Sequence, residues 1–333
     1  MTIQITIIGL GQIGASAGLA LGEYADDIVR VGHDKDSHAA QKAKRNEAID
    51  KTTLTLSNAV KDADIVFLAL PAHEIRPTLE YISQDLKKDA VVVDTAPIKR
   101  VVEEWAEEFL PPNRYYIGLL PVINPAYLQD FDYGIEAAHK NLFKGAPMAL
   151  IAGPRANAQA VNSVTSLIQL LGAKPLFVDA AEMDGLMTMN YIMPRLIAAA
   201  LVSATATKPG WREAQKFAGR EFAQVSEPIS FNGDPEALAS MVIHNSDNAV
   251  RVINDVIYAL QDLQRAVTDQ DGEALDEYLK EAYKKRNHWL IEREKGEWSD
   301  TKMSGEIPKV ERASLMKRML GFDSSRRRRL EEE

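Results

Sequence analysis

The chain has 333 residues, and its 39 Lys and Arg residues against 48 Asp and Glu residues give a formal net charge of −9. Its 46% of hydrophobic and 26% of charged residues are typical of a soluble globular protein. The sequence contains no cysteine, which excludes a disulfide scaffold, a cysteine-based zinc site and a thiol nucleophile. Because phosphate binding is driven by Lys and Arg, the acidic balance argues against nucleic acid as the main partner.

Residues 1–22 carry no charge and include a run of small residues at 15–17. A signal peptide needs a basic region before its apolar stretch, and this segment has none. Threonine, glutamine and spaced glycines also interrupt the segment, so it makes a poor membrane span. We therefore expect a cytoplasmic protein that does not contact a membrane.

In chain order, β-branched and apolar runs alternate with helical patterns through the first half of the sequence. Strands are expected at 3–8, 28–32, 64–70, 90–94, 115–120, 148–152 and 175–178, and helices at 15–24, 100–109 and 158–171. Such alternation is typical of an α/β fold with a mostly parallel, doubly wound sheet. We expect this fold over residues 1–180.

Strand signals stop at about residue 181, and long amphipathic stretches follow. Apolar residues recur at helical spacing within 248–267, and Asp271 is placed to cap a further helix that runs to about 294. We therefore expect an all-α second domain over 181–294. Its helices carry apolar residues on more than one face, for example Tyr258 and Trp289, which fits either a dimer interface or a core within one chain.

The last segment, 295–333, mixes Gly, Pro and Ser with charged residues, and it ends in four arginines at 326–329, one leucine and three glutamates. A basic cluster can bind nucleic acid or acidic lipid. Because these arginines adjoin glutamates, we expect a solvated, charged C-terminal tail instead.

A glycine pattern directly follows the first expected strand. It fits G-x-G-x-x-G and consists of Gly9, Leu10, Gly11, Gln12, Ile13 and Gly14. A helix is expected to start there, and Asp34 lies 20 residues beyond Gly14 at the end of the second strand, as in a Rossmann-type dinucleotide site. In such a site the first glycine permits a tight turn, the second admits the diphosphate and the third lets the helix approach the strand. The helix N-terminus then offers N–H groups to the phosphates.

Asp34 also predicts which dinucleotide binds. A carboxylate at this position accepts hydrogen bonds from ribose hydroxyls and repels a 2′-phosphate. His33 and Lys35 are placed to soften that repulsion, so NAD is the expected cofactor, NADP a weaker alternative and FAD a lesser one. A bound nicotinamide dinucleotide beside a helical domain predicts hydride transfer.

Further segments stand in a recognisable order and spacing. They are residues 9–16, 31–34, 64–71, 92–99, 142–147, 182–184 and 194–202. Together they resemble the prephenate/arogenate dehydrogenase family over about residues 3–290, more closely in the first domain than in the second. The resemblance implies NAD(P)-dependent oxidation of the ring hydroxyl carbon of prephenate or arogenate, with loss of carboxylate, in tyrosine biosynthesis. It also implies a homodimer formed through the helical domain.

Several positions depart from the family pattern. Pro97 stands where the family has a serine, and Leu120 where it has a histidine. Ile192 and Arg195 replace two further histidines, and a family arginine for the substrate carboxylate falls at Gln224. Because leucine can neither accept a proton nor donate a hydrogen bond, the family's acid–base contact is missing at residue 120. Three alternatives stay open: another group has taken over, the substrate is a different small hydroxy or amino acid, or the protein is a non-catalytic NAD-binding sensor.

A dehydrogenase of this kind needs a base for the hydroxyl proton and a cation for the substrate carboxylate, near the carboxyl ends of the strands. Lys99 and His73 are candidates for the base. Asn124 is a candidate for a hydrogen bond to the substrate, and Arg195 for binding its carboxylate. Each has a structural alternative, which is an ion pair for both cations, a turn for the asparagine and a helix start for the histidine.

Leu70 and Pro71 follow the fourth strand, where the nicotinamide end of the cofactor is expected. The remaining histidines are scattered without the spacing of metal ligands, so we expect no metal site. Residues 187–201 contain no lysine, which disfavours a β-hydroxyacid dehydrogenase.

Overall fold

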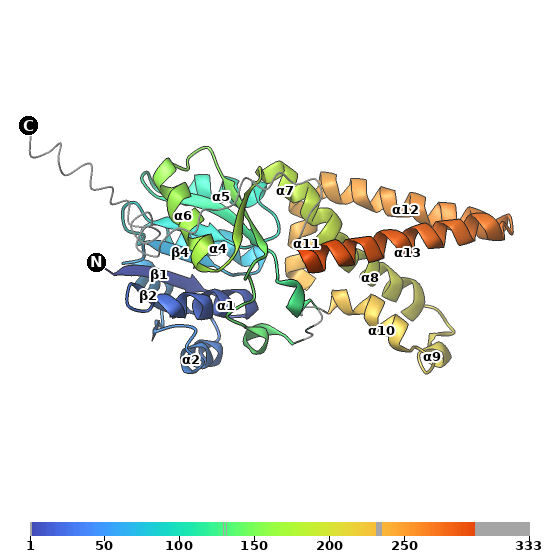
Figure 1. Ribbon diagram of the computed structural model, residues 1–333, viewed down its shortest axis with the longest axis horizontal. Helices are drawn as coiled ribbons and strands as arrows, with labels where there is room; N and C mark the ends of the chain where they lie inside the picture. Colours follow the sequence, from blue (N-terminus) through green and yellow to red (C-terminus); the bar gives the residue numbers. More distant parts are fainter. Residues whose placement is uncertain (1, 129, 131, 231–234, 297–333) are drawn as a thin grey trace, which may run out of the picture. The chain divides into compact units, whose positions relative to one another are not determined.

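Figure 1 shows the computed structural model of the chain. The structure describes residues 2–128, 130, 132–230 and 235–296. These residues form two compact units, which divide between Ala181 and Glu182. Apart from its first two residues, the predicted tail 295–333 lies outside the described residues, so that prediction stays open.

The first unit contains an eight-stranded sheet in the order β3-β2-β1-β4-β5-β6-β7-β8. The neighbouring strands run parallel, with the exception of the antiparallel pair β6 and β7. The strands are β1 (Ile3–Ile8), β2 (Ile28–His33), β3 (Lys51–Thr52), β4 (Ile65–Leu68), β5 (Val91–Asp94), β6 (Tyr115–Pro121), β7 (Pro147–Ala152) and β8 (Lys174–Phe177). The predicted mostly parallel, doubly wound sheet is therefore confirmed.

Helices and short turns of helix connect these strands. They are α1 (Gln12–Leu21), η1 (Gly22–Tyr24), α2 (Ser37–Arg45), α3 (Leu56–Val60), α4 (Ala72–Ile82), α5 (Arg100–Phe109), η2 (Pro125–Tyr127), η3 (Gly134–Ala137) and α6 (Ala158–Leu170). The helix predicted at 15–24 begins earlier, at Gln12, because the glycine loop itself provides its N-cap at Gly11. The helix predicted at 100–109 has these bounds in the structure.

Helices cover both faces of the sheet. Consecutive strand residues point to opposite faces, and because both sets are apolar here, each face needs a covering layer. Ile5, Phe67 and Val93 belong to one core cluster with residues of α1, α2 and α6. Val66 and Val92 are as deeply buried, but their alternation places them on the other face. The helices α3, α4 and α5 lie on this second face, since right-handed crossovers towards opposite edges of a sheet place their helices on opposite faces.

Strands β1, β2, β4, β5 and β6 end at one edge of the sheet, and the strand order reverses direction between β1 and β4. In open α/β sheets, ligands bind outside the carboxyl ends of the strands at such a switch point. The loops that follow these strands are therefore the place to search for the site.

The second unit is helical. Its elements are α7 (Ala180–Met187), the π-helical segment η4 (Thr188–Ile192), α8 (Met193–Ala206), α9 (Trp211–Ala214), α10 (Arg220–Ser226), η5 (Glu227–Ile229), α11 (Pro235–His244), α12 (Ser246–Thr268) and α13 (Gly272–Lys295). The predicted all-α character is confirmed. Asp271 caps α13 as expected, since its Oδ1 accepts a hydrogen bond from the Ala274 backbone N–H at 3.0 Å.

The two long helices α12 and α13 bury little of their apolar surface within the described residues. Only Ala249 and Val252 are buried on α12, and α13 has no buried residue. Tyr258 is 63% exposed and Trp289 is 48% exposed. Of the two predicted alternatives, a core within one chain is therefore wrong for these side chains.

The helical run Ala180–Ala206, which comprises α7, η4 and α8, is long and apolar enough to cross a membrane by length and composition. Only 22% of its most apolar 18-residue window is buried. Length and hydropathy do not by themselves separate a membrane span from a helix that packs against protein.

Candidate active site

The glycine loop between β1 and α1 has the backbone that the motif predicts. Gly9 has a φ of +89°, and a Cβ added to it lies 2.3 Å from the backbone oxygen of Ala69. A Cβ added to Gly14 lies 1.9 Å from the oxygen of Gly9. These two positions require glycine, because any side chain meets backbone that cannot move aside. The sequence therefore fixes how closely α1 approaches the sheet.

Gly11 has a different environment from these two glycines. A Cβ added to it has no heavy atom within 4 Å. Gly11 is also the N-cap of α1, and it has no side chain to satisfy the first N–H groups of that helix. Open space above an uncapped helix N-terminus fits the diphosphate of a dinucleotide, which these N–H groups bind.

Asp34 comes directly after β2 and turns back to the glycine loop. Its Oδ2 accepts a hydrogen bond from the Leu10 backbone N–H at 2.7 Å, and its Oδ1 accepts one from the Asp36 N–H at 2.8 Å. A carboxylate has about four lone-pair sites, so further acceptor capacity remains beside the loop. This placement fits the predicted binding of ribose hydroxyls.

The neighbours of Asp34 have partners of their own. Lys35 forms an ion pair with Glu74 of α4, although its side chain is 79% exposed. The Nδ1 of His33 lies 3.1 Å from the backbone oxygen of Thr53. The two residues expected to soften repulsion of a 2′-phosphate are thus engaged with other groups, which favours NAD over NADP.

The strand that carries Asp34 is held by a partly buried ion pair. Arg30 of β2 donates to Asp50 Oδ1 at 2.5 Å and to the backbone oxygen of Gly18 in α1 at 2.9 Å. Burial raises the pKa of Asp50, but the hydrogen bonds and charge of Arg30 outweigh burial and hold this pKa below its ordinary value. Because the folded-state pKa is lowered, the stabilisation is complete at neutral pH and is lost as the pH falls below about 4.

The loop after β4 meets the glycine loop. The Cδ2 atom of Leu70 lies 3.1 Å from the Cβ position built on Gly9, and Pro71 is the N-cap residue of α4. His73 follows in the first turn of that helix, with its side chain 24% exposed and its Nε2 3.9 Å from Glu74 Oε1. The structure therefore brings these three predicted residues to the switch-point edge of the sheet.

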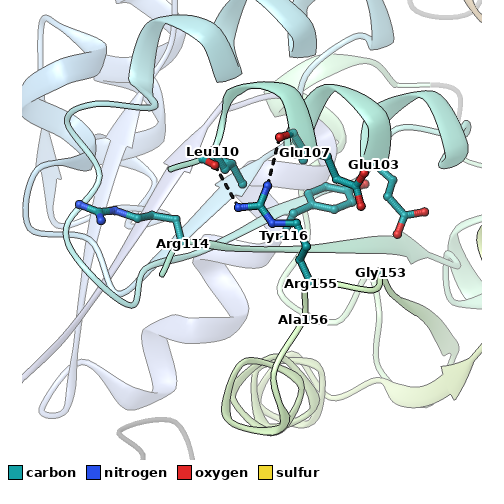
Figure 2. Close-up of a pocket in the computed structure, with 9 residues that line it drawn as sticks. Glu103, Glu107, Leu110, Arg114, Tyr116, Gly153, Arg155 and Ala156 are labelled. Carbon is teal, nitrogen blue, oxygen red and sulfur yellow. Dashed lines mark hydrogen bonds between the residues drawn. The ribbon is translucent and has the colours of Figure 1, made fainter. Parts of the chain in front are cut away.

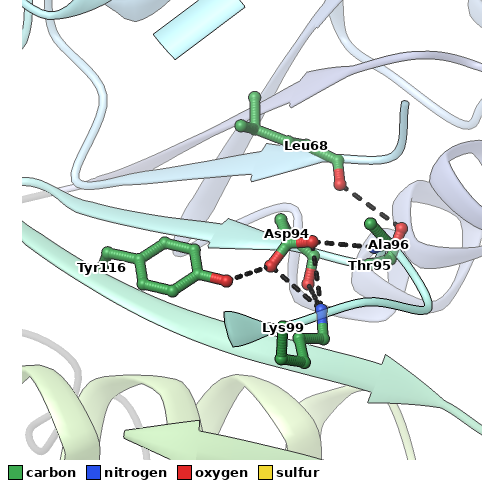
Figure 3. A network of polar contacts seen from close by, with 6 residues as sticks. All are labelled: Leu68, Asp94, Thr95, Ala96, Lys99 and Tyr116. Atoms are coloured by element: carbon green, nitrogen blue, oxygen red, sulfur yellow. Dashed lines mark hydrogen bonds and ion pairs between the residues drawn. The ribbon is translucent and has the colours of Figure 1, made fainter. Parts of the chain in front are cut away.

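Lys99 lies in a buried network after β5 (Figure 3). Its side chain and that of Asp94 are both 0% exposed, and its Nζ lies 3.0 Å from each carboxylate oxygen of Asp94. The hydroxyl of Tyr116 donates to Asp94 Oδ2 at 2.5 Å. This geometry matches the ion-pair alternative for Lys99, because an enclosed ammonium bound to a carboxylate does not present a base to a substrate.

Asn124 holds the turn that follows β6. Its Oδ1 accepts from the Ala126 N–H at 3.0 Å, and its Nδ2 donates to the backbone oxygen of Lys144 at 3.1 Å. This arrangement matches the turn alternative for the residue. Leu120, on β6 itself, is 8% exposed.

The connection between β6 and β7 is tied to α1, which sequence reasoning missed. Gln12 Nε2 donates to the backbone oxygen of Ala137 at 3.3 Å, and the His139 N–H donates to Ser16 Oγ at 2.9 Å. The hydroxyl of Tyr127 lies 2.6 Å from His139 Nδ1. A histidine and a tyrosine thus lie beside the helix that starts at the glycine loop. No local pattern signals these contacts, since each joins residues far apart in the sequence.

In the helical unit, Arg195 has a defined position one turn beyond the π-helical segment η4. Its Nη1 donates to the backbone oxygen of Tyr191 at 2.7 Å, and its guanidinium carbon lies 3.7 Å above the Tyr191 ring. π-Helical turns are frequent at functional sites. Ile192 is buried in the same segment, and Gln224 lies on α10.

Family models match both units. The model described as prephenate dehydrogenase, nucleotide-binding domain, matches residues 17–176, and the model described as prephenate dehydrogenase, dimerization domain, matches residues 179–281. The chain belongs to the prephenate dehydrogenase family. The predicted family is thus confirmed, and the expected dinucleotide-binding unit is matched by a nucleotide-binding domain.

Three members of the prephenate dehydrogenase family show how close the similarity is. Cyclohexadienyl dehydrogenase of Zymomonas mobilis is 25% identical over 285 residues, which cover 85% of this chain and 94% of that protein. The crystal structure of Synechocystis arogenate dehydrogenase is 26% identical, with a TM-score of 0.67 over 86% of this chain and 100% of that one. The structure of A. aeolicus prephenate dehydrogenase in complex with hydroxyphenyl propionate and NAD+ is 22% identical, with a TM-score of 0.75 over 86% and 98% of the two chains.

A shallow surface hollow lies elsewhere on the nucleotide-binding domain of this prephenate dehydrogenase homologue (Figure 2). It is lined by the end of α5, the start of β6 and the loop before α6. Arg155 donates there to the backbone oxygens of Glu107 and Leu110, at 3.0 and 3.1 Å, and so caps the C-terminal end of α5. Because β6 starts at this edge, the hollow lies opposite the edge that carries the glycine loop.

Within the part of the chain that the structure describes, no group of three or more His, Asp or Glu side chains is arranged to hold a metal ion. The candidate site in the first unit is therefore a dinucleotide cradle, formed by Gly9, Gly11, Gly14 and Asp34. The second unit carries a separate candidate residue, Arg195.

Proposed function

We propose that this chain is an NAD-dependent dehydrogenase that oxidises a cyclic hydroxy acid of the prephenate and arogenate class, in tyrosine biosynthesis. One observation carries the proposal. Asp34 accepts a hydrogen bond from the Leu10 N–H, next to the unfilled space at Gly11, so the expected ribose and diphosphate positions adjoin. The names of the relatives support the substrate class, because they include prephenate, arogenate and cyclohexadienyl dehydrogenases. A cytoplasmic location belongs to this proposal.

When bound, NAD supplies an acceptor for the hydride that leaves the ring carbon bearing the hydroxyl group. The proton of that hydroxyl needs a base, and the ring carboxylate leaves as carbon dioxide while the ring becomes aromatic. We assign the base to His73, which follows Pro71 at the edge where the glycine loop lies and has Glu74 beside it. Lys99 and Asn124, the other predicted candidates in this unit, are bound to Asp94 and to the backbone of a turn, so we do not assign the base to either.

Arg195 is the proposed anchor for the substrate carboxylate. Its guanidinium is held in one orientation by the Tyr191 ring and by the backbone oxygen of the same residue. A guanidinium fixed in this way can bind a carboxylate through two parallel hydrogen bonds with little further loss of side-chain entropy. It takes the place of the family arginine, whose position here is Gln224.

We also propose that two copies form a homodimer through the helical unit. The support is the match to the dimerization domain together with the exposed apolar side chains of α12 and α13. Burial of exposed aromatic side chains such as Tyr258 stabilises association by about 25 cal/mol for each Å² removed from water.

A second candidate is a dehydrogenase for a different small hydroxy or amino acid. Two observations favour it: Leu120 replaces the family histidine on β6, and Pro97 replaces the family serine after β5. If both substrate contacts are absent, the same cradle can serve another acid or act as an NAD sensor. His73 is then the group that separates a working dehydrogenase from a sensor.

The test measures formation of NADH by the purified protein with prephenate, with arogenate and with a panel of small hydroxy and amino acids. We expect turnover with prephenate or arogenate, and we expect His73→Ala to lower kcat by about 10²–10⁴-fold with little change in the affinity for NAD. Turnover restricted to another acid supports the second candidate. Tight NAD binding without turnover of any acid contradicts both and identifies a sensor.

A further inference from the structure

In the buried pair of Lys99 and Asp94, hydrogen bonds occupy the acceptor sites of the carboxylate, which are largely left to water in a surface ion pair. The two oxygens of Asp94 make four contacts, two with Lys99 Nζ, one with the Ala96 N–H at 2.8 Å and one with the Tyr116 hydroxyl. This set matches the roughly four lone-pair sites of a carboxylate. Lys99 Nζ also donates to the backbone oxygen of Asp94 at 3.2 Å.

A fully buried ion pair is an unusual choice if stability is its only purpose. Removing two charges from water is costly, and well-packed apolar residues of similar volume are often as stabilising or more so. In this chain the pair joins the last residue of β5 to the residue that precedes α5. Its geometric effect is to close the loop 95–98 into a ring of fixed shape.

The loop 95–98 lies where a dinucleotide-binding sheet holds the reacting end of its ligand. Such sheets consist of two mononucleotide-binding halves, and here the first half contains β1 and β2 with Asp34. The second half contains β4, β5 and β6, so by the same symmetry it faces the nicotinamide half. Thr95 is tied to β4 as well, since its N–H donates to the Leu68 backbone oxygen at 3.1 Å.

We propose that Lys99 is a positioning residue for the nicotinamide half of the cofactor, acting through Asp94 and the loop 95–98. This inference rests on the proposed function. Asp94 orients the loop by accepting the Ala96 N–H, and Lys99 holds that carboxylate in place through both of its oxygens. Figure 3 shows Tyr116 reaching Asp94 from the neighbouring strand β6, on the side opposite to the loop. The hydroxyl of Tyr116 therefore sets the orientation of the carboxylate.

The arrangement predicts a separation between the two halves of the ligand. A loosened loop 95–98 lowers the affinity for a ligand that has a nicotinamide ring and slows hydride transfer, because small misplacements of reacting groups are costly. It leaves binding of the rest of the cofactor unchanged, since we expect Gly11 to face the diphosphate and Asp34 the adenosine ribose. ADP-ribose differs from NAD+ only by the missing nicotinamide ring, so the ratio of the two affinities reports on the contribution of that ring.

The experiment compares NAD+ and ADP-ribose binding by calorimetry, together with kcat and KM, in three variants of the full chain. The paired variant Asp94→Asn/Lys99→Met removes both charges, and Tyr116→Phe removes a single hydroxyl. Val164→Ala is the matched control, because it opens a cavity at a fully buried residue of α6 in the same unit. The melting temperature of each variant is measured alongside.

We expect the paired variant to lose about 10–100-fold in NAD+ affinity and in kcat while its ADP-ribose affinity is unchanged. Tyr116→Phe shows the same pattern at a smaller amplitude, and it keeps the test decisive if the paired variant does not fold. Val164→Ala lowers the melting temperature without separating the two ligands. If the variants of the network also affect both ligands equally, Lys99 is structural and the inference is overturned. If the wild-type protein binds NAD+ but turns over no acid, the proposed function alone is contradicted. If it binds neither NAD+ nor ADP-ribose, both the proposed function and the inference on Lys99 are contradicted.

Discussion

The two units of this chain differ in how completely they bury their apolar side chains. The nucleotide-binding unit buries both faces of its sheet, and its ligand site is prepared by glycines whose neighbours are backbone atoms. The helical unit leaves large apolar side chains of α12 and α13 exposed within the described residues. A unit that binds a small ligand can complete its structure alone, whereas a unit whose helices lack a covering layer needs another surface. The comparison therefore supports the proposal that the first unit binds the ligand and the second unit associates with another copy.

The largest loss of NAD binding is expected from the glycines of the cradle. Gly14→Ala introduces a Cβ 1.9 Å from the oxygen of Gly9, so it destabilises the fold by about 3 kcal/mol and abolishes NAD binding. Gly11→Ala meets no atom within 4 Å, so it leaves the unfolding midpoint in urea unchanged but weakens NAD binding, because the new methyl group occupies the place of the diphosphate. Equal loss of stability in both variants contradicts the cradle as described.

The next largest effect is on association, and it is tested by replacing one exposed tyrosine of each unit with glutamate. Tyr258→Glu on α12 puts a carboxylate into the proposed dimer surface and weakens association by about 2 kcal/mol or more. Tyr81→Glu on α4 of the first unit starts from nearly the same exposure, 61% against 63%, and leaves the dimer intact. Sedimentation over a range of protein concentrations measures both, and dissociation by both variants or by neither removes the distinction between the units.

A smaller effect tests the ribose contact. Asp34→Ala removes a charged acceptor from the edge of the glycine loop. We expect the variant to lose about 1.5 kcal/mol of NAD binding free energy, which is about a tenfold loss of affinity. The affinity for NADP falls less, because the alanine variant no longer repels a 2′-phosphate. Calorimetric titration with both cofactors checks the ratio, and an unchanged ratio excludes Asp34 from ribose recognition.

The smallest effect is expected at an exposed ion pair, and the buried pair serves as its contrast. Lys280 and Asp276 are four residues apart on α13, and their side chains are 75% and 60% exposed. Lys280→Ala therefore costs less than about 0.5 kcal/mol, whereas Lys99→Met leaves Asp94 buried without its cation and costs about 3–5 kcal/mol. Denaturant unfolding of the two variants measures this difference, and comparable losses contradict the contrast.

Much of the first unit could be predicted because its signals are local. Buried parallel strands consist of continuous β-branched runs, and the glycine loop carries its geometry in six consecutive residues. The cap of α13 by Asp271 is local as well. The short strand β3 was not predicted, because Lys51 and Thr52 are too few for a period-2 pattern and are held only by their pairing with β2.

The roles of individual side chains were harder to predict, since they depend on partners far away in the sequence. Lys99 reads equally well as a base or as a structural cation until Tyr116, on another strand, is placed beside Asp94. Arg195 gains its defined orientation from a π-helical turn, which has no simple sequence signature. The exposure of α12 and α13 was also ambiguous, because an apolar helix face does not reveal whether its partner belongs to the same molecule.

The antiparallel pairing of β6 with β7 relaxes the constraint on the length of the segment that connects these two strands. Parallel neighbours must be joined by a crossover long enough to span the sheet and of one handedness, but an antiparallel return carries neither requirement. The segment between these strands can therefore gain or lose residues while the rest of the architecture stays the same. Leu120 lies just before this adaptable segment. A change in the length of this connection therefore leaves the strand order unaltered, and with it the edge of the sheet that carries the glycine loop and Asp34.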